Sequence, residues 1–82
     1  MEKFFLQARG FLAEQLAIEE EKITMDTVFE DINADSIDIV EMIMALEDVY
    51  GVEFPEEDLE DYPVMGMLIK ALFSFLQREG KA

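Results

Sequence analysis

Apolar residues recur every three to four positions in three stretches of the chain, which predicts three α-helices. The first covers residues 2–16, the second lies between Asp35 and Gly51, and the third covers residues 65–78. No segment alternates apolar and polar residues as a strand does, so we expect an all-α fold. The stripes expected to be buried are Phe4, Phe5, Ala8, Leu12 and Leu16, then Ile39, Met42, Ile43, Leu46, Val49 and Tyr50, then Met65, Leu68, Ile69, Leu72, Phe75 and Leu76.

The connections between these stretches differ in character. Residues 17–34 form a connection that is long for a small domain, and we expect its apolar residues Ile23, Val28, Phe29 and Ile32 to anchor it to the core. Residues 53–55 are extended in this interpretation, and residues 56–61 form at most a short acidic helical turn. The prediction is a small bundle of three main helices plus one short helix, whose long first connection crosses the bundle. We expect residues 1–82 to form a single domain.

The second helix has the clearest end signals. Asp35 suits the N-cap position, and Asp38 adds negative charge to the first turn, where the helix dipole favours it. Gly51 is typical of a C-cap in the left-handed conformation. Helical spacing then predicts an outward face that contains Asp38, Glu41, Met44, Glu47 and Asp48.

Charge limits the possible partners. Residues 23–69 contain 14 Asp or Glu and no Lys or Arg, and the chain has a net charge of −14. Nucleic acid and anionic membranes would repel such a protein, so we expect partners with basic surfaces. The 51% hydrophobic content indicates a folded core. Because no apolar run is long enough for a membrane span or a signal peptide, we expect a free-standing, cytoplasmic monomer.

The residue types also exclude several kinds of catalysis. The chain has neither His nor Cys, and therefore has no imidazole base, thiol nucleophile, disulfide or zinc-type ligand set. Ser36 has no such base to activate it, so we do not expect an enzyme, although Ser36 suits a substrate of another enzyme. Asp31, Asn33 and Asp35 have the spacing of a calcium loop, but Ser36 stands where that loop needs Gly and Met42 where it needs Glu. We therefore expect no metal site of this kind, and weak divalent binding at the acidic clusters stays open as an alternative.

Residues 34–48, ADSIDIVEMIMALED, resemble the signature of the acyl carrier proteins. The flanking matches are Glu14-Gln15-Leu16, Ile23-Thr24-x-Asp26, Phe29 and residues 50–58, and the resemblance covers about residues 3–72. In that family the motif serine carries 4′-phosphopantetheine, which a phosphopantetheinyl transferase takes from coenzyme A. The thiol of this arm carries acyl groups as thioesters. The resemblance therefore implies a phosphoprotein of fatty acid biosynthesis and lipid metabolism, with Ser36 as the attachment residue.

The resemblance also implies roles for other positions. It implies basic-surfaced acyl-transfer and chain-elongation enzymes as partners, which would contact Asp35, Ile37, Asp38, Val40, Glu41, Met44, Glu47 and Asp48. It implies an acyl pocket lined by Ile39, Met42, Ile43, Leu46, Leu59, Tyr62, Leu68 and Leu72, for which ordinary core packing is the alternative. A phosphate on Ser36 would also lie near backbone N–H groups at the helix N-terminus, which favour an anion.

Departures from the family pattern leave a specialised member of the family open. Asn33 replaces the usual Gly, although Asn tolerates the left-handed backbone, and Ile37 replaces the usual Leu. Asp61, Pro63 and Val64 stand where a Lys and a Thr pair are common. Two alternatives stay open. One is a carrier of an amino acid or polyketide unit, and the other is an acidic interaction module without a prosthetic group, whose function would survive Ser36→Ala.

Overall fold

Three α-helices and three short 3-10 helices form the part of the chain that the computed structural model describes, residues 1–56 and 58–81. The α-helices are α1 (Glu2–Leu16), α2 (Ser36–Tyr50) and α3 (Met65–Arg78), and the 3-10 helices are η1 (Glu20–Lys22), η2 (Phe29–Ile32) and η3 (Leu59–Asp61). The all-α class and the bounds of the three main helices are confirmed. Within the expected turn at residues 56–61, η3 covers the last three residues, and Glu57 lies outside the described residues. The two 3-10 helices of the first connection were not predicted, because such short turns have no periodic signal.

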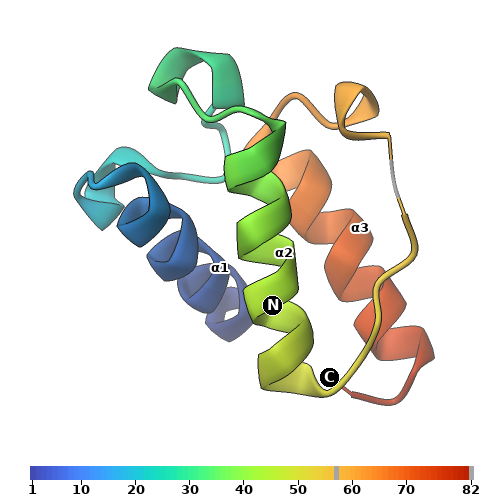
Figure 1. The fold of residues 1–82 in the computed structure, drawn as a ribbon. Helices are drawn as coiled ribbons and strands as arrows, with labels where there is room; N and C mark the ends of the chain where they lie inside the picture. Colours follow the sequence, from blue (N-terminus) through green and yellow to red (C-terminus); the bar gives the residue numbers. More distant parts are fainter. Residues whose placement is uncertain (57, 82) are drawn as a thin grey trace.

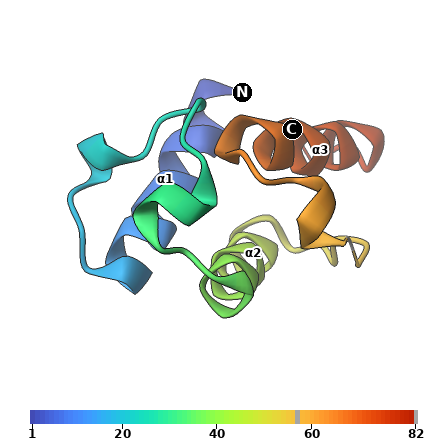
Figure 2. The ribbon, with the colours of Figure 1, turned by 90° about the horizontal axis from the view of Figure 1, so that it is seen from above.

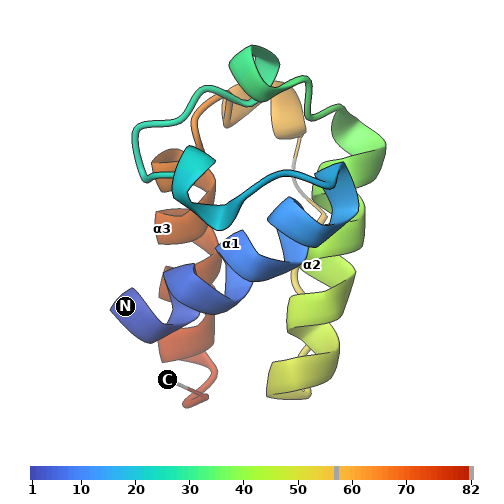
Figure 3. The same ribbon diagram turned by 90° about the vertical axis from the view of Figure 1, so that its left-hand side faces the viewer.

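The helices surround a core that is closed at one end by the connections. Helices α2 and α3 run in the same direction, and α1 crosses beside them in the opposite sense (Figure 1, Figure 3). The first connection passes over the end of the bundle where α2 begins, and η3 lies at that same end. Figure 2 looks down on this end, where η2 and η3 lie on either side of the first turn of α2. The first residue of α2 is therefore framed by two connections that are distant in sequence.

The predicted stripes form most of the core. The buried residues of α1 are Phe4, Ala8, Leu12 and Ala13, those of α2 are Ile39, Met42 and Leu46, and those of α3 include Met65, Leu68, Ile69, Leu72 and Leu76. Ile23 and Phe29 of the first connection are also buried, while Val28 and Ile32 are half-buried. The expected anchoring of the long connection by its own apolar residues is thus confirmed.

Val49 is an exception, because its side chain is 48% exposed. The ring of the next residue, Tyr50, packs on Phe4 with centroids 5.5 Å apart, and its hydroxyl donates a hydrogen bond to Gln7. Neighbouring residues on a helix point about 100° apart, so turning Tyr50 toward α1 leaves Val49 at the edge of the apolar stripe. The prediction that Val49 is buried was wrong.

Backbone hydrogen bonds fasten the first connection to the start of α3. The N–H of Phe29 donates to Pro63 O at 3.0 Å, beside an isolated antiparallel bridge between Val28 and Val64. The N–H groups of Met65 and Gly66 donate to Thr27 O at 2.8 Å and Met25 O at 2.7 Å. Helix α3 has no side-chain N-cap, so carbonyl groups of a distant segment satisfy its first donors.

No helix among the described residues is both long and apolar enough to cross a membrane.

Candidate functional site

Ser36 is the first residue of α2 and is exposed to solvent. The preceding Asp35 is the N-cap, and its Oδ1 accepts hydrogen bonds from the N–H groups of Ile37 at 3.0 Å and Asp38 at 3.1 Å. In return, Asp38 Oδ2 accepts from the N–H of Asp35 at 3.2 Å. This reciprocal arrangement is a capping box, which fixes the first turn of the helix. The prediction that Asp35 is the N-cap is confirmed. The Ser36 side chain therefore projects from a first turn whose backbone is held by hydrogen bonds.

The chain segment that leads into Ser36 turns at a residue whose backbone is in the left-handed conformation. Asn33 has φ 56° and ψ 31°, a conformation that Asn adopts more readily than most residues. Its N–H donates to Glu30 O at 3.1 Å, and the N–H of Ala34 donates to Phe29 O at 3.0 Å. Ala34 is only 8% exposed. The chain therefore turns at Asn33, tucks Ala34 inward and presents Asp35 and Ser36 at the surface.

Helix α1 also supports this turn through a contact that the sequence analysis missed. The side-chain amide of Gln15 donates to Asp38 Oδ1 at 3.3 Å, and the two residues lie 23 positions apart. Both oxygens of the Asp38 carboxylate thus have partners within the chain, and Asp38 is half-buried. No periodic or short-range pattern links residues so distant, so only the folded arrangement shows that Gln15 positions this turn.

The outward face of α2 combines apolar and acidic side chains. Ile37 is 68% exposed, Val40 42% and Met44 52%, which is high for large apolar residues. Asp35, Glu41 and Asp48 are exposed as well. Glu47 was expected to face outward but is half-buried, because its Oε2 accepts a hydrogen bond from the N–H of Phe54 at 2.8 Å. Glu47 therefore ties the segment after α2 to the helix.

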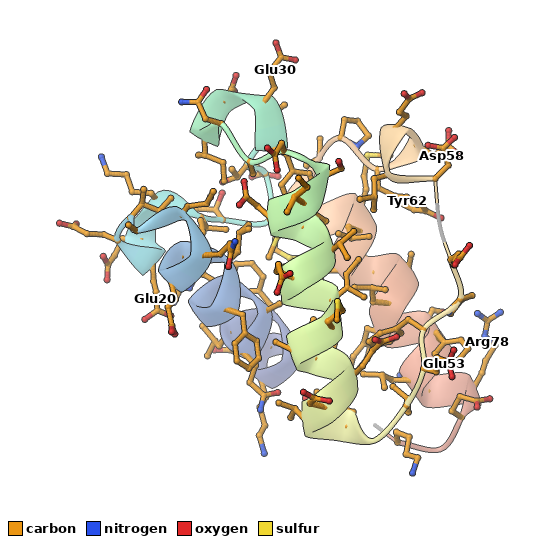
Figure 4. All side chains as sticks on the ribbon, in the orientation of Figure 1. Glu20, Glu30, Glu53, Asp58, Tyr62 and Arg78 are labelled. Carbon is orange, nitrogen blue, oxygen red and sulfur yellow. The ribbon has the colours of Figure 1, made fainter. Side chains whose placement is uncertain are left out.

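Two hollows adjoin this face. The smaller, about 570 Å³, lies beside Ser36 and is lined by η2, the start of α2 and η3. The larger, a groove of about 960 Å³, lies between the later turns of α2 and residues 51–56, with Leu72 of α3 in its lining. Side chains of the η3 region are visible in Figure 4, where Asp58 points away from the bundle and Glu30 of η2 points into solvent.

Comparison with known proteins identifies the family to which this chain belongs. Residues 7–72 match the family model described as "Phosphopantetheine attachment site". Acyl carrier proteins of three Clostridium perfringens strains are each 40% identical over 67 residues, which cover 80% of this chain and 88% of the relative. The chain belongs to the acyl carrier protein family. Members of this family are carriers and not catalysts, their prosthetic group is phosphopantetheine, and they work with phosphopantetheinyl transferases and acyl-handling enzymes.

The surroundings of Ser36 fit the prosthetic group of acyl carrier proteins in one respect and differ from expectation in another. The exposed hydroxyl and the adjoining hollow leave room for an arm that starts at Ser36. However, the N–H groups of Ile37 and Asp38, which were expected to favour a phosphate, are already bound by Asp35. A phosphate on Ser36 would therefore lie outside this capping box and beside the Asp35 carboxylate, without these two N–H groups as partners.

The residues expected to line an acyl pocket are distributed over three environments. Ile39 lines the hollow beside Ser36, Ile43 and Leu72 line the groove, and Leu59 lines both. Met42, Leu46 and Leu68 are at most 1% exposed and lie in the core, while Tyr62 is half-buried and lines neither hollow. In residues 1–56 and 58–81, no group of three or more carboxylates is placed to hold a metal ion.

We expect added salt to raise the melting temperature of this acyl carrier family member. The longest dimension of the molecule is 32 Å, so its many acidic groups repel one another across short distances. At 0.1 M ionic strength the Debye length is about 10 Å, which screens most of this repulsion. Thermal unfolding followed by circular dichroism in rising sodium chloride, and separately in magnesium chloride, checks this. A melting temperature that stays flat or falls would contradict it.

Proposed function

We propose that this chain bears a 4′-phosphopantetheine arm on Ser36 and carries acyl intermediates as thioesters in fatty acid or related acyl biosynthesis. The observation that carries the proposal is the exposed Ser36 hydroxyl, held at the first residue of α2 by the Asp35–Asp38 capping box within the matched region. The arm supplies a thiol, which a chain without Cys lacks.

Attachment requires a partner enzyme, because the described residues around Ser36 offer carboxylates and no imidazole. In the transferase complex, Ser36 Oγ attacks the coenzyme A phosphorus on the pantetheine side. A new phosphorus–oxygen bond forms, the pyrophosphate bond breaks, and adenosine 3′,5′-bisphosphate leaves. The hydroxyl proton passes to a base of the transferase. The role of this chain is to hold Ser36 exposed and rigid while the transferase docks.

We further propose that partners dock on the α2 face described above. Its exposed apolar residues, Ile37, Val40 and Met44, offer area for contact, and the exposed carboxylates of Glu41 and Asp48 attract basic residues. Such steering gives fast and salt-sensitive association, which suits a carrier that meets several enzymes in turn. Asp38 and Glu47 have a second role in this proposal, because their carboxylates also bind within the chain.

The proposal is tested by intact mass spectrometry after incubation with coenzyme A and a promiscuous phosphopantetheinyl transferase. We expect the mass to rise by one phosphopantetheine. Circular dichroism and a starting mass establish that the protein is folded and unmodified beforehand. No mass gain in such a sample would overturn the proposal and favour an acidic interaction module.

Reversing one charge on the docking face should slow this modification. Glu41 is exposed and takes no part in the capping box, so we expect Glu41→Lys to keep the fold. Because an exposed ion pair contributes up to about 1 kcal/mol, kcat/KM for the transferase should fall about fivefold, and less at high salt. The matched control is Glu79→Lys, which changes the net charge equally at the far end of α3 and should leave kcat/KM unchanged. Equal effects of the two variants would contradict docking on α2.

A further inference from the structure

Two glutamines of α1 join this helix to α2 through side-chain hydrogen bonds. Near the start of α1, Gln7 accepts from the Tyr50 hydroxyl, and both of these residues are half-buried. In the last turn of α1, the amide of Gln15 donates to Asp38 Oδ1 at 3.3 Å. Gln15 is exposed, and Asp38 lies in the first turn of α2, two residues after Ser36. The second contact therefore acts on the turn that presents Ser36.

The end of α1 holds the backbone of Gln15 in place. Ala17 is in the left-handed conformation, with φ 57° and ψ 45°. The N–H of Ile18 donates to Ala13 O at 3.0 Å, and the N–H of Ala17 donates to Glu14 O at 3.3 Å. This pair of hydrogen bonds is a Schellman C-cap, which closes the last turn of a helix. Because Ala13 is buried and Ile18 packs against the core, the Gln15 side chain extends from a fixed turn.

A series of hydrogen bonds leads from Gln15 to the backbone on both sides of Ser36. Asp38 Oδ1 accepts from Gln15, and Asp38 Oδ2 accepts from the N–H of Asp35 at 3.2 Å. Asp35 Oδ1 accepts in turn from the N–H of Ile37 at 3.0 Å. The residues directly before and after Ser36 are thus both held by this series. Without the Gln15 donor, the Asp38 carboxylate has more freedom to rotate out of the capping box.

The donor that orients Asp38 is uncharged, which keeps this carboxylate useful for docking. An amide leaves the negative charge of Asp38 in place, and each carboxylate oxygen has a second lone pair for a further donor. Asp38 can therefore be held in one orientation and still attract a basic residue of a partner. A side chain that is already ordered also loses less conformational entropy when the partner binds.

We propose that Gln15 is a positioning residue for the transfer of phosphopantetheine to Ser36. It acts through Asp38, by holding the carboxylate and the first turn of α2 in the arrangement that the transferase binds. This inference rests on the proposed function, because it concerns the rate at which Ser36 is modified. Gln15 itself takes no part in bond formation at Ser36.

The test measures kcat/KM of the transferase, at saturating coenzyme A, for wild type, Gln15→Ala, Gln15→Glu and Gln7→Glu. Ala and Glu are good helix formers, so both should preserve α1, and circular dichroism checks the fold. Gln15→Glu has nearly the shape of the wild-type side chain but replaces the donor with an acceptor. Gln7→Glu is the matched control, because it makes the same change on the same helix and keeps the acceptor for Tyr50.

We expect kcat/KM to fall about twofold to tenfold in Gln15→Ala, as for the loss of one hydrogen bond, and at least as far in Gln15→Glu. Gln7→Glu should match wild type. An added negative charge by itself favours a basic partner, so it does not explain a lower kcat/KM in Gln15→Glu. Values of kcat/KM in both Gln15 variants that equal wild type would overturn the inference while leaving the proposed function intact.

A double-mutant cycle tests whether the effect passes through Asp38. In an Asp38→Ala background, Gln15→Ala should cause no further loss of kcat/KM, whereas a role confined to the stability of α1 gives the same loss in both backgrounds. That second result also overturns the inference. If Asp38→Ala is unfolded, the comparison of Gln15→Glu with Gln7→Glu decides. A folded, unmodified wild type that gains no phosphopantetheine would instead overturn the proposed function and this inference with it.

Discussion

Replacing Ser36 with alanine is expected to abolish the mass gain from coenzyme A completely, while the helical content stays that of wild type. The loss is complete because the hydroxyl oxygen is the atom that would form the bond to phosphorus. The fold should survive because the Ser36 side chain is exposed and the capping box uses Asp35 and Asp38. Intact mass and circular dichroism on the same sample measure both effects.

The chain provides a matched control for this variant. Ser74 is the other serine, it lies exposed on α3, and it is outside the residues matched to the phosphopantetheine family. Ser74→Ala should gain one phosphopantetheine as wild type does. A mass gain in Ser36→Ala, or its loss in Ser74→Ala, would assign the attachment to another residue.

Replacing Gly66 with alanine is expected to destabilise the fold by about 1–3 kcal/mol, although alanine is the better helix former by about 1 kcal/mol. A Cβ at this position would lie 2.6 Å from Met25 O, closer than real Cβ atoms approach a backbone oxygen. The same oxygen accepts the hydrogen bond from the Gly66 N–H, so the clash would push the first connection away from α3. The melting temperature should fall by about 4–8 °C per kcal/mol.

Gly10 gives the opposite expectation and serves as the control. It lies inside α1, and an added Cβ would meet Glu20 Oε1, the end of an exposed side chain, at 3.4 Å. Gly10→Ala should therefore stabilise the protein by about 0.5–1 kcal/mol. Thermal and urea unfolding of both variants measure the pair. A Gly66→Ala variant as stable as wild type would show that the contact with Met25 does not constrain the fold.

Much of the fold follows from local features of the sequence. The three main helices, the N-cap at Asp35 and the left-handed Gly51 were predicted, because periodicity and capping depend on residues a few positions apart. The left-handed backbone of Asn33 agrees with the prediction that Asn substitutes for Gly there. The burial of Val49 was predicted wrongly, since the orientation of Tyr50 toward Phe4 involves a residue of another helix.

For the candidate site, sequence and tertiary structure determined different things. The sequence by itself determined the three amphipathic helices, the position of Ser36 at a helix start, the acidic character of the chain and its likeness to acyl carrier proteins. Only the tertiary structure decided that Gln15 supports Asp38, that carbonyl groups of the first connection cap α3, and that Leu59 lines both hollows. The physical reason is that helix signals are local, whereas these contacts join residues brought together only when the bundle packs.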